Sequence, residues 1–255
     1  MMDNLKIISD DLGLYSSVND GIIFALKNKL ITGASIMANG EAFNDALEKL
    51  RTVNEPNIGI HFVLVEEEPF VAKRLEENHQ VFFIKYILGL IDLDDIEKEL
   101  QAQLNKVIQS GIKISFINSH QHLHLLPRIT DIIIKLAKDN NIEYIRTVTE
   151  PFNLKRGLFR ALESLFLTLL SNLAKNKINK MGIGTNDFFF GFLSAGSLEK
   201  EDVDLVKDYY SKNKDKIIEL GCHLGYENDE MKEKYKHWGS YNWQSELKVL
   251  ENANF

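Results

Sequence analysis

Short apolar runs alternate with longer segments of helical periodicity along the whole chain, and this alternation limits the folds that the chain can adopt. Runs of this length that lack helical spacing are typical of buried strands. Strands are predicted at Leu5–Ser9, Ala34–Ala38, Ile58–Leu64, Lys113–Ile117, Glu143–Thr147 and Lys216–His223. Helices are predicted near Val18–Leu26 and at Glu41–Leu50, Asp94–Ser110, Ile129–Lys138 and Val203–Tyr210. Residues 65–89 and 182–196 are expected to be irregular.

A strand followed by a helix, repeated many times, indicates a parallel sheet covered by helices. About seven such units in 255 residues suit a closed or nearly closed barrel. The predicted fold is therefore an α/β, single-domain (β/α) barrel, either distorted or seven-stranded, with residues 1–255 in one domain. The pattern alone does not separate a barrel from an open, doubly wound sheet.

Charge and composition exclude several classes of function. The net charge of −7 provides no global positive field, so no nucleic-acid partner is expected. A lone cysteine, Cys222, cannot form an internal disulfide, which fits a reducing compartment. The first residues contain no apolar run long enough for a signal peptide, and no stretch suits a membrane span. A cytoplasmic location is expected.

Acidic residues and histidines lie directly after predicted strands. In parallel α/β folds the carboxyl ends of the strands form one rim, and active sites are assembled there. Five of the seven histidines and one acidic pair are therefore expected on one edge; the other two, His79 and His237, lie in polar sequence. The residues predicted at this edge are Asp10, Asp11, His61, His120, His122, His124 and His223.

Each of these residues also has a structural interpretation when it is taken alone. An aspartate after a strand can cap a loop or a helix, and a single buried histidine is often a satisfied core residue. The three histidines in the segment 120–124 are more specific, since alternate residues of an extended segment share one face. That segment favours metal binding even without the other residues.

Aspartate and two histidines form a usable ligand set for a divalent cation, with positions left for water. A bound cation lowers the pKa of that water and polarises an amide carbonyl. A second carboxylate can accept the water's proton, and an opposite histidine can protonate the leaving nitrogen. These groups together suffice to hydrolyse an unactivated amide.

Five ordered segments resemble the YdjC-like carbohydrate deacetylases, a family that includes chitooligosaccharide deacetylases and the hopanoid-associated HpnK branch. The similarity runs from Ile7 to about Tyr226. The segments are IISDDLGLYSSVNDGI, TGASIMANGEAF, IGIHFVL, INSHQHLHLLPRI and GCHLGY.

The resemblance implies a role for each matching residue. It implies a divalent metal, Mg²⁺ or Zn²⁺, on Asp11, His61 and His120. It implies that Asp10 is the general base and His223 the general acid. His122 and His124 would orient the ligands or contact substrate, and Arg146 would steady the base or bind an anionic group, although a plain salt bridge is an equal alternative. The implied fold is a barrel related to NodB-type polysaccharide deacetylases.

The sequence departs from the family pattern at positions beside the implied ligands. Asn118 replaces the usual aspartate, Gln121 stands where many relatives have histidine, and Leu224 replaces proline; Ile8, Ser9 and Leu12 also differ. None of these changes removes an implied ligand, base or acid. They leave the choice of metal and of substrate open.

The segment 155–180 carries a broad apolar face flanked by basic residues. One interpretation is a helix that lies in an anionic membrane interface, and the other is a barrel helix packed on the core. The first implies a substrate carried on a lipid, such as a polyprenyl phosphate or hopanoid, and a peripheral position on the inner face of the membrane. The apolar residues at helical spacing are Leu158, Leu162, Leu165, Phe166, Leu169 and Leu173.

The expected function is thus removal of the acetyl group from an N-acetylhexosamine. If the substrate is linked to a lipid, the HpnK branch and enzymes of lipid A modification are the relevant models. The alternatives are a soluble chitooligosaccharide deacetylase, a metal-dependent phosphoesterase and a non-catalytic sugar- or lipid-binding relative. The sequence does not decide whether the protein forms a homo-oligomer.

Overall fold

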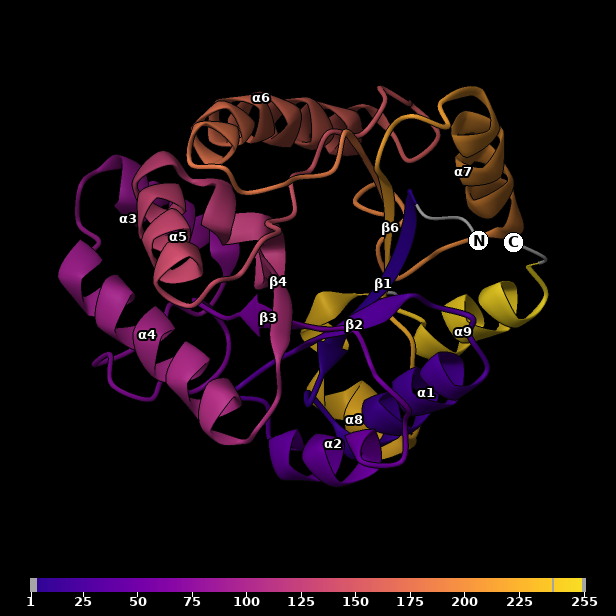
Figure 1. Cartoon of the computed structure of the whole chain (residues 1–255), viewed down its shortest axis with the longest axis horizontal. Coiled ribbons are helices and arrows are strands. Elements are labelled where there is room, and N and C mark those ends of the chain that lie inside the picture. The colour runs from indigo at the N-terminus through magenta and orange to yellow at the C-terminus, as the bar shows by residue number, and fades with distance from the viewer. Residues whose placement is uncertain (1–3, 240, 254–255) are drawn as a thin grey trace.

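The computed structural model describes residues 4–239 and 241–253. Its centre is a six-stranded, all-parallel sheet in the order β4-β3-β2-β1-β6-β5, and the ribbon in Figure 1 shows the sheet curling inside a layer of helices. The strands are β1 Leu5–Leu12, β2 Gly33–Ile36, β3 Ile58–Phe62, β4 Ile114–Ser119, β5 Phe188–Phe190 and β6 Ile218–Cys222.

The helices follow the strands and cover the outside of the sheet (Figure 1). They are α1 Ser16–Lys27, α2 Phe43–Leu50, α3 His79–Ile87, α4 Leu93–Gln109, α5 Pro127–Asp139, α6 Leu158–Lys180, α7 Lys200–Lys212, α8 Asp229–Lys234 and α9 Trp243–Glu251. Two 3₁₀ helices, η1 His120–Leu125 and η2 Lys236–Trp238, lie beside them. No helix of the described residues is long and apolar enough to cross a membrane.

The two edges of the sheet are joined by the segment 143–149, which includes the strand predicted at Glu143–Thr147. On one side Ile117 of β4 pairs with this segment, donating to the carbonyl of Tyr144 at 2.9 Å and accepting from the amide of Arg146 at 2.9 Å. On the other side Phe189 of β5 donates to the carbonyl of Thr149 at 3.0 Å. The strand prediction at 143–147 is wrong, because the segment forms only isolated bridges. The curled six-stranded sheet with these bridges is consistent with a distorted barrel.

The strands are buried on both faces, as apolar runs without alternation predict. Glycines allow the covering elements to approach the sheet closely. A Cβ at Gly21 of α1 would lie 2.5 Å from the Cα of Gly225, so α1 packs directly on the backbone that follows β6. This contact fixes the loop that begins with His223.

Regular structure also occurs where none was expected. Helix α3 lies within the segment predicted to be irregular, and its start is capped by Asn78, whose side chain accepts from the amide of Val81. Strand β5 lies within the predicted loop 182–196, and α8 and α9 follow β6. Short elements such as these carry too few residues for a periodic pattern to be recognised.

Candidate metal centre and active site

An irregularity at the end of β1 turns two adjacent carboxylates toward one site. Successive side chains of a regular strand point to opposite faces, so neighbouring aspartates would normally diverge. Here the pairing with β2 shifts register between Ser9 and Leu12, and Asp11 has a left-handed φ of 67°. Both carboxylates are buried, with Asp10 3% and Asp11 1% exposed. A left-handed aspartate inside a strand is sterically costly and is typical of functional sites.

Three side chains meet at the carboxyl end of the sheet in an arrangement that suits a metal ion. One ligand atom from each of Asp11, His61 and His120 lies within 4.8 Å of the others. Oδ1 of Asp11 is 3.3 Å from Nε2 of His61 and 3.8 Å from Nδ1 of His120. Both oxygens of Asp11 and Nε2 of His61 are buried, and none of the described residues forms a hydrogen bond with them. Buried polar atoms are rarely left unpaired, so these donor atoms fit a cation.

The two histidines are oriented through their other ring nitrogens. Nδ1 of His61 is 2.8 Å from Oδ1 of Asn118, and Nε2 of His120 is 3.3 Å from a carboxylate oxygen of Glu66. A hydrogen bond from the far nitrogen fixes the ring and leaves the lone pair of the near nitrogen free for a cation. Asn118 is one of the departures from the family pattern, and its amide oxygen serves as an acceptor here.

Asp10 is held by side chains from β2, from β4 and from the segment 143–149. Its carboxylate accepts from Nη1 of Arg146 at 2.5 Å, Nη2 of Arg146 at 3.0 Å, the hydroxyl of Ser35 at 2.7 Å and the amide of Asn118 at 2.9 Å. Burial on its own would raise the pKa of Asp10, but the positive charge of Arg146 and the nearby His61 outweigh it. The pKa of Asp10 therefore lies well below its usual range, and the group stays ionised.

Arg146 is fully buried between two carboxylates. Its Nε donates to Glu219, which also accepts from the hydroxyl of Tyr144 at 2.6 Å. Burial would lower the pKa of Arg146, yet the charges of Asp10 and Glu219 raise it above its ordinary value. Arg146 therefore binds Asp10 rather than a substrate anion.

The segment 120–124 is not extended, so the expectation that its three histidines share one face is wrong. After β4 the chain enters η1, in which Gln121 and His122 adopt left-handed φ values of 53° and 55°. His124 turns into the core, where its ring lies 2.7 Å from the hydroxyl of Ser119 and 2.9 Å from the carbonyl of Arg146. Burial lowers its pKa to about 3, so His124 is neutral and structural.

His223 directly follows β6, which pairs with β1 on the side away from β3 and β4. It shares the lining with Asp10, His61 and His120, and its side chain remains 14% exposed. Nδ1 of His223 has no hydrogen-bond partner within the part of the chain that the structure describes. Burial lowers the pKa of His223, and the charges of Asp11 and Asp10 offset part of this effect.

Part of the cavity lining is aromatic. The cavity holds about 460 Å³ of space, including open solvent at its mouth. Ring centroids of Phe189 and Phe192 lie 5.7 Å and 5.9 Å from that of His122, whose Nδ1 is buried and unpaired. The guanidinium of Arg160 stacks over Phe192 at 3.7 Å, and Tyr241 packs beside His223. Aromatic walls with a few polar atoms are typical of small-molecule sites.

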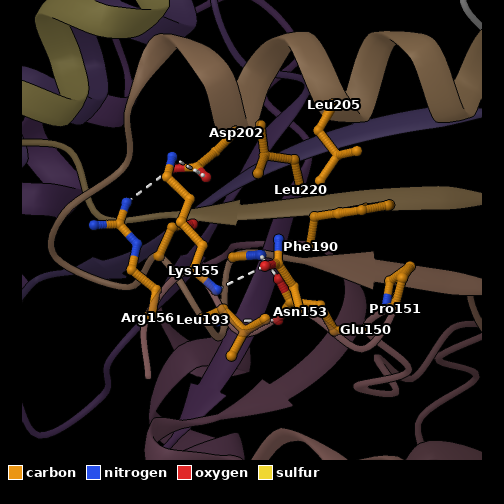
Figure 2. A pocket seen from close by; sticks show the side chains of 12 residues that line it. Glu150, Pro151, Asn153, Lys155, Arg156, Phe190, Leu193, Asp202, Leu205 and Leu220 are labelled. Carbon is orange, nitrogen blue, oxygen red and sulfur yellow. Dashed lines mark hydrogen bonds and ion pairs between the residues drawn. The ribbon is translucent and has the colours of Figure 1, made fainter. Parts of the chain in front are cut away.

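A carboxylate behind this wall holds it in place. Figure 2 shows Glu150 in the neighbouring pocket, with Leu193 and Phe190 close by. Glu150 accepts from the backbone amides of Gly191, Phe192 and Leu193 at 3.0–3.2 Å. Lys155 and Arg156 of the same pocket pair with Asp202. Glu150 thus anchors the turn that presents Phe192 to the active-site cavity.

Two parts of the site were missed from the sequence. Glu66 follows β3 in a segment expected to be irregular, and it accepts from the indole of Trp238 at 2.6 Å as well as contacting His120. His237, expected at the surface, lies 3.8 Å from the same carboxylate. Neither Glu66 nor Trp238 carries a local sequence signal, because tertiary folding alone brings residues 66 and 238 together.

Comparison with known proteins places the chain among related sequences. A family model described as YdjC-like protein matches residues 4–255. A carbohydrate deacetylase of Oceanobacillus iheyensis is 34% identical over 143 residues, which are 53% of this chain and 61% of that protein. One of Xenopus laevis is 28% identical over 212 residues, 75% of this chain and 67% of that protein. One of Clostridium beijerinckii is 30% identical over 56% of this chain and 60% of its own length. The matches to the two bacterial relatives span only about three fifths of those proteins.

The fold has a counterpart among solved structures. A crystal structure from Enterococcus faecalis V583, described as a candidate cellobiose-phosphate cleavage protein, superposes with a TM-score of 0.70. The match covers 96% of this chain and 89% of that one at 20% identity. At this identity the likeness establishes a shared fold.

Proposed function

Because the chain belongs to the YdjC-like family, we propose that it is a metal-dependent hydrolase that removes the acetyl group from an N-acetylhexosamine unit and releases acetate. The observation that carries the proposal is the meeting of Asp11, His61 and His120 around unpaired buried donor atoms. Asp10 and His223 lie beside these ligand atoms in the same cavity. Relatives named carbohydrate deacetylase support the chemistry. Residues 1–255 would form one domain, with a barrel related to NodB-type deacetylases.

Asp11, His61 and His120 would hold a divalent cation, Mg²⁺ or Zn²⁺. Such a cation lowers the pKa of water and polarises a carbonyl oxygen. Two nitrogens and one carboxylate leave coordination positions free, as a catalytic rather than a structural site requires. Asn118 and Glu66 would keep both imidazoles in the tautomer that offers a lone pair to the cation.

Asp10 is the proposed general base. Its contacts with Arg146, Ser35 and Asn118 fix the carboxylate beside the ligand cluster and keep it ionised. A carboxylate of low pKa is a weak base, so it can accept a proton only from a water that has itself been made acidic.

His223 is the proposed general acid. It lines the same cavity as His61 and His120, and its Nδ1 has no hydrogen-bond partner among the described residues. A protonated imidazole in this cavity can donate to the departing amine nitrogen. His122, Phe189, Phe192 and Arg160 would bind the sugar ring at the mouth of the cavity.

A sugar carried on a lipid is the substrate that we favour within this class. The support is the exposed apolar face of α6, which adjoins the cavity through Arg160. A soluble chitooligosaccharide remains the alternative substrate. A metal-dependent phosphoesterase would be expected to place a basic side chain free to bind phosphate at the cluster, whereas Arg146 is taken up by two carboxylates. A non-catalytic binding relative would have no use for an ionised carboxylate beside a set of potential metal ligands.

Acetate release tests the proposal. The protein would be incubated with lipid-linked and soluble N-acetylhexosamines, with and without chelator, and the products weighed by mass spectrometry. We expect the replacement of one acetyl group by hydrogen, abolished by chelator and by Asp10→Asn or His223→Gln. Asp20→Asn, at an exposed carboxylate that does not line the cavity, serves as the matched control. Full activity of Asp10→Asn would show that Asp10 is not the base, and full activity of His223→Gln that His223 is not the acid. Circular dichroism with metal titration would show that each variant is folded.

A further inference from the structure

Helix α6 presents most of its large apolar side chains to solvent, while mainly small side chains, together with Ile178 and the half-buried Leu167 and Leu170, face the protein. The residues that it buries are Ala161, Ser164, Ser171, Ala174 and Ile178. The residues that it exposes, each between 43% and 75%, are Leu158, Phe159, Leu162, Leu165, Phe166, Leu169 and Leu173. The interpretation that this apolar face packs on the core is therefore wrong. A helix that buries alanine and serine while exposing leucine and phenylalanine needs another covering partner.

The exposed residues form one continuous stripe. At about 100° per residue, all seven fall within an arc of roughly 120° on the helix surface. Figure 1 shows α6 along the upper margin of the molecule, where its outer side is uncovered. Phe152 and Leu154, 61% and 54% exposed, lead into the helix and lengthen the apolar surface.

Helix α3 extends the stripe on one side. The ring of Phe83 contacts that of Phe166, with centroids 5.4 Å apart. Beyond this contact, α3 and the residues that follow it expose Ile84, Ile87, Leu88 and Leu90 at 59–66%. We call the exposed residues of both helices the α3–α6 surface. Exposed apolar patches built from two elements commonly mark interaction sites.

The charge of α6 differs from that of the whole chain. The helix carries four basic residues, Arg160, Lys175, Lys177 and Lys180, and one acidic residue, Glu163, which gives +3 in a chain of net −7. Arg160 pairs with Glu163 within the helix, and Lys175 and Lys177 form ion pairs with Asp187 and Asp131 of neighbouring segments. Lys177 and Lys180 are exposed and continue the arc of the stripe through the last turn. Anionic lipid attracts such a surface, whereas a second copy related by a twofold axis would bring two cationic helices together.

We propose that the α3–α6 surface binds peripherally to a bilayer that contains anionic lipid. The leucine and phenylalanine side chains enter the boundary between headgroups and acyl chains, and the lysines of the last turn contact lipid phosphate. The helix lies in the plane of the interface. It does not cross the membrane, since no helix within the described ranges meets the requirements of a span.

Docking in this way places the cavity next to the bilayer. The use of this position for a lipid-linked substrate rests on the proposed function. The first turn of α6 supplies both features: Phe159 is 75% exposed on the stripe, and the adjacent Arg160 lines the cavity. Arg160 also donates to the carbonyl of Phe192 at 2.7 Å, which ties the turn to the aromatic wall. A sugar carried on a lipid in the same bilayer would reach the cavity along this turn.

Vesicle co-sedimentation tests the docking directly and needs no enzymatic turnover. Wild-type protein is mixed with vesicles of pure phosphatidylcholine or of phosphatidylcholine with phosphatidylglycerol, at low and high salt. The test variant is the triple substitution Phe159→Ser, Leu162→Ser and Leu169→Ser. The matched control is Val71→Ser, Ile108→Ser and Leu205→Ser, three exposed apolar residues elsewhere. Because all six side chains are exposed, both variants should fold, which thermal melts by circular dichroism verify.

We expect binding to the anionic vesicles, a decrease at high salt and at least about tenfold weaker binding of the test variant than of the control. Lys180→Gln should weaken binding more than Lys248→Gln on α9. Absence of wild-type binding, or equal binding of the two triple variants, would overturn the proposal. The proposal would also be overturned if sedimentation velocity showed that the wild type and the control variant form a dimer and the test variant does not. Activity on a soluble N-acetylated sugar is measured in parallel, so that a failure of docking is distinguished from a failure of the proposed reaction.

Discussion

Arg146 binds both carboxylate oxygens of Asp10, through Nη1 at 2.5 Å and Nη2 at 3.0 Å, and directs its third nitrogen to Glu219. A planar guanidinium can satisfy two buried carboxylates in this way, whereas an ammonium is a point charge on a flexible stem. The pair therefore fixes the orientation of Asp10 beside the ligand cluster as well as its ionisation.

Replacing Arg146 with lysine should leave Asp10 charged but poorly positioned. We expect kcat to fall about 100-fold, because a small displacement of a catalytic group has effects of this size. The pKa of Asp10 should rise, so the loss of activity at acid pH should begin at a higher pH than in the wild type. The measurement is the pH profile of kcat, with metal affinity as the control. An unchanged profile would mean that Arg146 does not act through Asp10.

Glu66→Gln should weaken cation binding without disturbing the fold. The amide keeps an oxygen for the indole of Trp238 but removes the charge that orients His120. Loss of such an outer contact typically costs about tenfold or more in metal affinity. Isothermal titration with Zn²⁺ or Mn²⁺ measures the change, and Glu68→Gln, an exposed neighbour, is the matched control. Equal affinity of the two variants would show that His120 needs no such partner.

The proposed role of His223 predicts the direction of one limb of the pH profile. A general acid must be protonated in the free enzyme, and burial holds the pKa of His223 below its ordinary value of 6.5. The value of kcat/KM should therefore fall as pH rises through that pKa, and this limb should be absent in His223→Gln. A rising limb at the same position would instead assign His223 the role of base.

Glu246 should make stability depend on pH. Burial raises its pKa from 4.5 to about 8, although backbone amides of His223 and Leu198 donate to it and act in the opposite direction. Between pH 4.5 and pH 8 the folded protein holds a proton on this group that the unfolded chain has lost. The contribution of Glu246 to the free energy of unfolding therefore decreases as pH rises through this window.

Urea unfolding of wild-type protein and Glu246→Gln at several pH values measures this contribution. The wild type should lose stability relative to the variant from pH 4.5 to pH 8, since glutamine does not titrate. A constant difference between the two proteins would show that Glu246 is ionised in the folded state throughout.

Much of the fold follows from local pattern. The apolar runs predict five of the six strands, and the positions of Asp10, Asp11, His61, His120 and His223 after those strands predict that they meet. What the pattern lacks is backbone detail. The register shift that turns Asp10 and Asp11 the same way depends on pairing with β2, and the left-handed residues of η1 separate three histidines that an extended segment would align.

Other features depend on tertiary context. The spacing of leucines in α6 predicts an apolar face but not the direction in which it points, and only the packed structure shows it directed outward. Glu66, Trp238 and Glu246 reach the site from segments with no periodic signal. The metal and the sugar are not fixed by the ligand residues, since an Asp-His-His set accepts several divalent cations.

The central claim is that Asp11, His61 and His120 share one cation, and anomalous diffraction from crystals grown with Zn²⁺ or Mn²⁺ tests it most directly. We expect a single strong anomalous peak within roughly 2.0–2.3 Å of a carboxylate oxygen of Asp11, Nε2 of His61 and Nδ1 of His120. The same peak should be lost in Asp11→Asn. A peak elsewhere, or no peak in crystals soaked at saturating metal, would contradict it.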